Sequence, residues 1–293
     1  MLRRTAPLFA IALVGLLTAC GGNSKSSSTT TTNASPGSSP AASGAKSGQA
    51  GSITIAGSTA LLPLIKQAAV DYQSSHGNVK ISVSGGGSRV GITQAAQKGV
   101  DIGDSDIAAP DQPSLVDHQV AVVVFGVVVN PKAGVKNLTT AQIRSVFGGQ
   151  TTNWKQVGGA DQKITIINRP RSSGTRAVFV KNLMGGTQPV ETGLTQDSSG
   201  TVATMVAQTP GAVSYLAMGY VKPGQQVAVS INGVDPSNQN VESNKYPFWS
   251  YEHMLTNGQP PAYVVDFINF VKTDSGLLTQ LHFLPVASMK AKS

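Results

Sequence analysis

The segment Arg169-Pro170-Arg171-Ser172-Ser173-Gly174-Thr175 stands between an apolar run typical of a β-strand, residues 164–167, and a run typical of a helix, residues 177–183. A strand that passes through a Ser/Gly/Thr turn into a helix directs several unpaired backbone N–H groups to one point, with hydroxyls and a guanidinium beside them. This pattern predicts an anion site. The same order recurs within 53–66, where Gly57-Ser58-Thr59 separates a strand from a helix. Together, the two turns predict one tetrahedral anion held between two lobes.

Strand-like and helix-like segments alternate from residue 51 onward, which is typical of an α/β fold with largely parallel sheets. Strands are predicted at 53–56, 79–83, 100–103, 120–130, 212–216 and 227–231. Helices are predicted at 60–74 and 90–97, after Thr139 or Thr140, after a cap at Ser199, and around 267–271. The alternation therefore indicates a mixed α/β protein with the helices packed on the sheets.

The run 120–130 is rich in β-branched residues and shows little alternation of polar and apolar residues. Such a run is typical of a strand that is buried on both faces. We expect it to cross between the two lobes, with 227–231 as the candidate for the return crossing.

The first 20 residues have the features of an export signal. Arg3 and Arg4 precede the apolar segment 8–17, which is too short to span a bilayer. Small residues lead into Cys20, the only cysteine of the chain, as in a bacterial lipobox. We expect Cys20 to be lipidated and to become the first mature residue; the alternative is an ordinary secretory signal followed by an incidental free cysteine.

Composition divides the remaining chain into a tether and a folded part. Residues 21–50 consist almost wholly of small and polar residues, which predicts a disordered tether. The net charge of +8 is compatible with nucleic acid or with small anions as partners. Because the basic residues are scattered and aromatic residues make up only 5% of the chain, nucleic acid is not expected.

Four loops carry candidate ligand residues: 58–60, 87–88, 104–106 and 169–175. Taken singly, each has an ordinary structural explanation, because Ser and Thr often cap helices, Asp often occupies turns and Arg often forms surface ion pairs. Each loop nevertheless follows a predicted strand. Open α/β sheets bind ligands at the carboxyl ends of their strands, so the four loops predict one common site.

These motifs resemble the phosphate-binding proteins that supply high-affinity phosphate ABC transporters, a branch of the type II periplasmic-binding-protein fold. The resemblance spans roughly 53–286. It rests on Gly57-Ser58-Thr59, the glycine-rich turn ending in Ser88, the segment 100–106, Phe147-Gly148-Gly149 with Thr152-Asn153-Trp154-Lys155, the segment 169–175, Pro210-Gly211-Ala212-Val213 and Tyr246-Pro247-Phe248.

The resemblance implies a two-lobed fold in which each lobe is a mostly parallel sheet flanked by helices, with the ligand in the interlobe cleft. Lobe one is expected at 51–125 plus 240–293, and lobe two at 126–239. The ligand residues carried over by position are Thr59, Ala60, Ser88, Asp106, Arg169, Ser173, Gly174 and Thr175. In these roles Arg169 neutralises the charge of the anion, and Asp106 accepts a hydrogen bond from the phosphate's own proton.

The function implied is that of an extracytoplasmic, lipid-anchored monomer that captures inorganic phosphate and delivers it to a membrane permease, without a cofactor. Arg89 and Arg171 depart from the family pattern and, with Ser58, are left open as ligands. Another tetrahedral oxyanion, such as sulfate or molybdate, is the alternative ligand, and a surface phosphatase or an adhesin the alternative class. A metal site is not expected, because the four histidines are isolated: His76, His118, His253 and His282.

Overall fold

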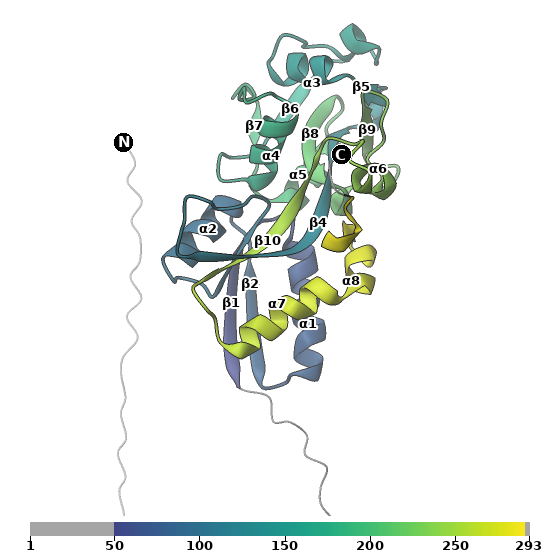
Figure 1. The fold of residues 1–293 in the computed structure, drawn as a ribbon. Coiled ribbons are helices and arrows are strands. Elements are labelled where there is room, and N and C mark those ends of the chain that lie inside the picture. Colours follow the sequence, from purple (N-terminus) through teal and green to yellow (C-terminus); the bar gives the residue numbers. More distant parts are fainter. Residues whose placement is uncertain (1–49, 291–293) are drawn as a thin grey trace, which may run out of the picture. The chain divides into compact units, whose positions relative to one another are not determined.

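Strand β4 (Leu115–Val129) organises the sheet, because it joins two regions of it. The structure, a computed structural model, describes residues 50–290, so Cys20 and nearly all of the expected tether lie outside the described residues. Up to Val124, β4 pairs with β10 (Trp249–Asn257), and from Phe125 onward it pairs with β8 (Ala212–Ala217). Figure 1 shows β4 and β10 running together through the middle of the fold.

The sheet has the order β2-β1-β3-β10-β4-β8-β6-β7, with β11 and β9 paired to β4 and β5 paired to β9. The remaining strands are β1 (Gly51–Gly57), β2 (Val79–Ser84), β3 (Ile102–Ser105), β5 (Asn137–Leu138), β6 (Thr165–Asn168), β7 (Leu194–Thr195), β9 (Val227–Ile231) and β11 (Phe283–Leu284). The α-helices are α1 (Leu62–Ser75), α2 (Ser88–Ala96), α3 (Thr140–Phe147), α4 (Gly174–Asn182), α5 (Ser199–Gln208), α6 (Asn238–Glu242), α7 (Ala262–Thr273) and α8 (Ser275–Gln280). The 3₁₀ helices are η1 (Pro131–Ala133), η2 (Trp154–Val157), η3 (Met218–Tyr220) and η4 (Val286–Ser288).

The predicted α/β class is confirmed, but the sheets are less parallel than expected. Pairing is parallel among the outer strands, β1 with β2 and β3, and β6 with β7 and β8. All the pairs that β4 forms are antiparallel, because β8, β9, β10 and β11 run against it. The pair of β3 with β10 is antiparallel as well, so the expectation of mostly parallel sheets holds only for the pairs that involve neither β4 nor β10.

The apolar run of β4 is buried as predicted, since every residue from Val120 to Val129 is buried. The expectation that 227–231 returns the chain across the lobes is wrong. This segment is β9, which pairs with residues 127–129 of β4 and with β5. The chain rejoins the other part of the sheet only at β10. Regular apolar spacing identified the strand but carries no information about its pairing partner.

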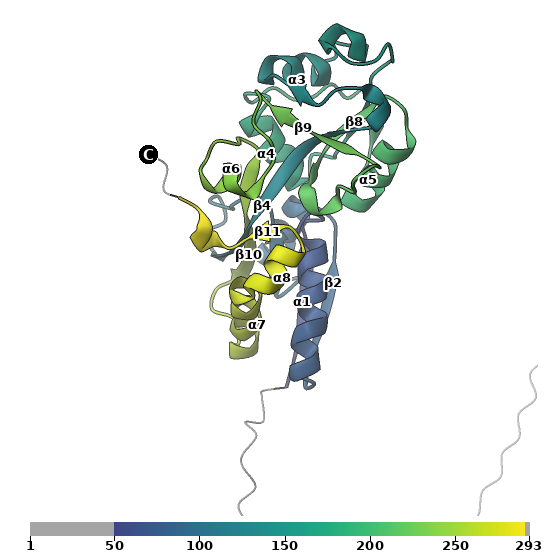
Figure 2. The same ribbon diagram turned by 90° about the vertical axis from the view of Figure 1, so that its right-hand side faces the viewer.

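Helix α1 presents the apolar face that its spacing predicts: Leu64, Ile65, Ala68 and Tyr72 are all buried. Tyr72 packs edge-on against Phe267 of α7, with 5.3 Å between the ring centroids. Figure 2 shows α1 next to α7 and α8, with β2 beside α1. Within residues 50–290, none of the helices has both the length and the apolar character that crossing a membrane requires.

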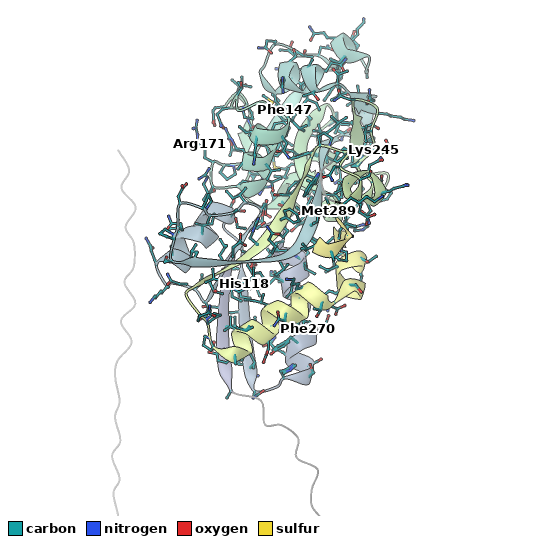
Figure 3. The ribbon with its side chains drawn as sticks, in the orientation of Figure 1. His118, Phe147, Arg171, Lys245, Phe270 and Met289 are labelled. Carbon is teal, nitrogen blue, oxygen red and sulfur yellow. The ribbon has the colours of Figure 1, made fainter. Side chains whose placement is uncertain are left out.

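A cluster of aromatic rings supports α4, the helix that follows the segment 169–173. Phe179 of α4 stacks on Tyr215 of β8 at 4.2 Å between centroids, and Phe147 of α3 contacts Phe179 edge-on at 4.7 Å. Phe147 is labelled in Figure 3. The hydroxyl of Tyr215 accepts a hydrogen bond from the Arg169 backbone N–H at 3.4 Å. The core therefore fixes the start of the loop in which the anion site is predicted.

Candidate anion-binding site

The carboxylate of Asp106 joins the two parts of the sheet. Its Oδ1 accepts a hydrogen bond from the Ser58 hydroxyl, which follows β1, and its Oδ2 accepts one from the Thr175 hydroxyl of α4 at 2.7 Å. The Asp106 backbone N–H donates to the Ser88 hydroxyl at 3.0 Å. All four residues are at most 1% exposed. The loops after β1, β2 and β3 therefore meet the first turn of α4 at one buried point.

Ser58 also serves the first turn of the chain that leads into α1. Its hydroxyl oxygen accepts hydrogen bonds from the backbone N–H groups of Ala60 at 3.0 Å and Leu61 at 3.2 Å. The residue before α1 provides no side-chain cap, so Ser58 satisfies donors that would otherwise be unpaired. The backbone N–H of Ala60, one of the predicted ligand residues, therefore donates to the same Ser58 hydroxyl that donates to Asp106.

Arg169 is 1% exposed and lies at the end of β6. Its Nη2 donates to the Thr59 hydroxyl at 2.8 Å, and its Nη1 donates to the Ser199 hydroxyl at 3.2 Å. Its Nε donates to the carbonyl of Gln196 at 3.0 Å, and Nη2 also donates to the carbonyl of Asp197 at 2.5 Å. Arg169 thus connects Thr59 in one part of the sheet to the loop before α5 in the other.

Burial lowers the pKa of Arg169, and the Asp106 carboxyl is the foremost of the neighbours that raise it again. Guanidinium groups stay protonated in proteins, so Arg169 carries a buried positive charge. Within residues 50–290, hydroxyls and carbonyls accept its hydrogen bonds, and it forms no ion pair with a carboxylate at contact distance. A buried cation among neutral acceptors favours an anion nearby.

The first turn of α4 is fixed by its own sequence. Ser173 caps the helix, because its hydroxyl accepts a hydrogen bond from the Arg176 backbone N–H at 3.3 Å. A Cβ added at Gly174 would lie 2.1 Å from the Ser88 hydroxyl oxygen and 2.9 Å from the Asp106 Cβ. Only glycine allows α4 to approach the loops of the other part of the sheet this closely.

Arg176 fixes the loop that begins at Arg169 by a hydrogen bond to its backbone. It is buried, and its Nη1 donates to the Arg169 carbonyl at 2.8 Å while its Nη2 bonds to Glu191 at 2.8 Å. The hydrogen bond from Arg176 and its charge lower the pKa of Glu191. This pair fixes the backbone of Arg169, and the guanidinium of Arg169 remains directed at Thr59.

The structure brings all eight sequence-predicted residues together, and it places the two extra arginines elsewhere. Arg171, labelled in Figure 3, has a 74% exposed side chain and lies 3.4 Å from Glu191. The Nε of Arg89 donates to the Arg171 carbonyl at 3.1 Å, and Arg89 is exposed. Ser58, which the sequence left open, is the one of these three that reaches Asp106.

Sequence reasoning missed several residues of this site. Ser199 was expected to cap α5, but Ser198 is the cap, which leaves the Ser199 hydroxyl 2.9 Å from that of Thr59. Tyr220 donates to the Thr59 carbonyl at 2.6 Å, and burial raises the pKa of its hydroxyl to about 12. Glu252 of β10 is completely buried beside Asp106. For Ser199, the available signal was the adjacent pair Ser198-Ser199. One serine of such a pair can cap the helix, which leaves the hydroxyl of the other free for a different contact.

Across residues 50–290, no three His, Cys, Asp or Glu side chains come together as metal ligands. His253 instead bonds through Nδ1 to Asp117, and His118 lies 3.2 Å from the Thr256 hydroxyl. Figure 3 labels His118.

Comparison with known proteins places this chain in a family. The PBP superfamily domain matches residues 36–275. The phosphate-binding protein PstS of Bacillus subtilis is 43% identical over 248 residues, which cover 82% of each chain. PstS of Borreliella burgdorferi is 26% identical over 242 residues, covering 76% of this chain and 85% of that protein. The chain therefore belongs to the PBP superfamily, in the PstS family of phosphate-binding proteins.

Solved structures show the same fold. An ABC-type phosphate transport receptor from Vibrio cholerae is 30% identical, with a TM-score of 0.66 over 79% of this chain and 99% of that one. A substrate-binding protein with bound phosphate from Clostridium perfringens is 24% identical, with a TM-score of 0.76 over 80% of this chain and 99% of that one. The two-lobed fold class expected from the sequence is thereby confirmed.

Proposed function

We propose that this protein captures inorganic phosphate outside the cytoplasm and delivers it to the membrane permease of an ABC transporter. The observation that carries the proposal is the buried meeting of Arg169 and Asp106 with hydroxyls from both parts of the sheet. The names of the relatives support the choice of phosphate, because the proteins that match over most of the chain are phosphate-binding proteins.

The donors around Asp106 and Arg169 suit a tetrahedral oxyanion. Hydroxyls of Thr59, Ser88 and Thr175, and backbone N–H groups at the starts of α1 and α4, can donate to phosphate oxygens. The Arg169 guanidinium adds charge-assisted hydrogen bonds, which are about twice as strong as neutral ones. Asp106 is an acceptor, and phosphate near neutral pH retains a proton to donate to it. Ser173 takes part through the start of α4, which it caps.

Capture by this site requires motion between two lobes, which we place at 51–125 plus 240–293 and at 126–239. Thr59 and Asp106 belong to the first lobe, and Arg169 and Thr175 to the second. Their direct hydrogen bonds mark a closed arrangement. Opening about β4 and the chain before β10 would admit the ligand, and closure would bury it.

The proposed role is binding without catalysis, by a monomer that needs no cofactor. Calorimetric titration of residues 51–293, which comprise the two proposed lobes, with phosphate, sulfate, molybdate and a phosphate monoester tests it. We expect phosphate to bind most tightly and the monoester not to be hydrolysed. Tighter binding of sulfate or molybdate would reassign the ligand, and turnover of the monoester would favour a phosphatase.

Replacing Arg169 tests the source of charge. Arg169→Ala is expected to weaken phosphate binding by about 2–5 kcal/mol, because it leaves a buried anion without its cation. Arg171→Ala is the matched control, and should cost less than about 1 kcal/mol because its side chain is 74% exposed and its ion pair is a surface one. Equal losses in the two titrations would contradict the assignment of Arg169.

Replacing Gly174 tests whether phosphate binding requires the close contact between α4 and Ser88. Gly174→Ala places a Cβ 2.1 Å from the Ser88 hydroxyl oxygen, so closure should be opposed by overpacking of about 1–3 kcal/mol. Phosphate affinity should fall accordingly, while the melting temperature without phosphate stays near that of the wild type. Gly77→Ala is the control, because nothing lies within 4 Å of its added Cβ. An unchanged affinity of the Gly174 variant would remove this contact from the bound state.

Replacing Asp106 tests how the site selects phosphate over sulfate. Sulfate has no proton to donate near neutral pH, so it would meet the Asp106 charge directly, and the preference for phosphate would arise from that repulsion. Asp106→Asn should narrow the difference between the two dissociation constants, because the amide can donate to sulfate. If the variant keeps the full preference for phosphate, Asp106 only orders its loop and does not select the ligand.

Cys20 tests the anchor, which we propose to be a lipid at the mature N-terminus. A doubly acylated N-terminus holds a protein on a bilayer, where one acyl chain would be marginal. Cys20→Ser should therefore move the protein from the membrane fraction to the soluble or uncleaved fraction. Retention in the membrane fraction, with the same migration of the mature band as the wild type, would show that Cys20 carries no lipid.

A further inference from the structure

A second buried acid lies beside Asp106 on the neighbouring strand. Strand β10 runs antiparallel to β3, with His253 opposite Ser105 and Met254 opposite Asp104. Continuing this register by one residue places Glu252 opposite Asp106. Residues directly opposite in an antiparallel pair share one face of the sheet, with Cβ atoms about 4.5–5.5 Å apart. The pairing of β10 with β4 also shifts register between Glu252 and His253.

The surroundings of Glu252 do not suit a charged carboxylate. Its side chain is completely buried, and among the described residues no N–H or hydroxyl group donates to either of its carboxyl oxygens, so the polar group that lies near it is the carboxyl of Asp106. Asp104 on the same face is 1% exposed, and its Oδ1 likewise lacks a partner there. An ionised carboxylate buried without donors is strongly disfavoured, and such a group takes up a proton instead.

The charged groups of the elements packed against β10 leave Glu252 without a cation of its own. Arg89 of α2 is exposed and bonds to the loop at 171. On β4, Asp117 bonds to His253, and His118 lies against Thr256. Arg169, from the other part of the sheet, is directed at Thr59. The charged groups that act on the Glu252 carboxyl are the acids Asp106 and Asp104.

Of the three acids, Asp106 is the one that is solvated by the protein. It accepts a hydrogen bond from a hydroxyl on each of its two carboxyl oxygens, whereas neither Glu252 nor Oδ1 of Asp104 accepts one among the described residues. Burial raises the pKa of Glu252 well above its ordinary value, and the charges of Asp106 and Asp104 and a hydrogen bond with the Asp106 side chain raise it further. Burial and Asp106 act in the same direction on the pKa of Asp104.

We infer that Glu252 is held as a neutral carboxylic acid beside Asp106, so that Asp106 alone supplies the negative charge that selects a protonated oxyanion. This inference rests on the proposed function. Glu252 is a positioning residue in this scheme, since it acts on the ligand only through the electrostatics of Asp106. An ionised Glu252 would add a second buried negative charge next to a bound dianion and oppose its binding.

The free protein allows a direct test, because the chain contains only three glutamates: Glu191, Glu242 and Glu252. Labelling the glutamate side-chain carboxyl carbons with ¹³C should give, at pH 7, one signal at the position of a protonated carboxyl group. Glu252→Gln should remove that signal, and the control Glu242→Gln should leave it in place. Three ionised signals at pH 7 would overturn the inference, whatever the protein binds.

Phosphate titrations across pH then test the link to binding. The dissociation constant of the wild type, divided by that of Glu252→Gln, should stay constant wherever the Glu252 signal is that of the acid. Where that signal becomes ionised, the ratio should rise by up to about tenfold per pH unit, because only the wild type gains the repelling charge. A ratio that changes while Glu252 is still protonated, or that stays flat through its ionisation, would overturn the coupling. Failure of the wild type to bind phosphate at pH 7 would instead contradict the proposed function.

Discussion

The buried guanidinium of Arg169 is the constraint on which the rest of this site depends. Removing a charge from water costs several kcal/mol even after relaxation, so each N–H group must find an acceptor. The chain supplies acceptors from both parts of the sheet: the Thr59 hydroxyl on one side, and the carbonyls of Gln196 and Asp197 with the Ser199 hydroxyl on the other. The hydrogen bonds of the Arg169 guanidinium therefore hold the two lobes together.

The buried charge of Arg169 also bears on which acid of the site is charged. One buried cation can stabilise one buried anion, and Asp106, with two hydroxyl donors, is the group equipped to be that anion. Asp104 and Glu252 share its face of the sheet, and burial raises the pKa of both well above their ordinary values. The net charge of the site therefore depends on which of its acids lack hydrogen-bond donors. It cannot be obtained by counting the acidic residues in the sequence.

Features that depend on local sequence could be predicted, and features that depend on pairing could not. The apolar face of α1 and the buried run of β4 follow from spacing, and the candidate ligands follow from turns at strand ends. The return crossing assigned to 227–231 was wrong, because periodicity does not name a strand's partner. Glu252 was missed for the same reason, since only the register of β10 against β3 brings it beside Asp106.

The hydrogen bonds within the site also limit how a ligand can gain affinity from it. Ser58 and Thr175 already donate to Asp106, and Thr59 already accepts from Arg169. A bound oxyanion would exchange these bonds for bonds to itself, so only the difference between the two sets appears in the binding free energy. Hydroxyl–phosphate bonds gain because the anion is charged, whereas a neutral ligand of the same shape would gain almost nothing. Charge, more than the number of donors, therefore determines what this site can hold.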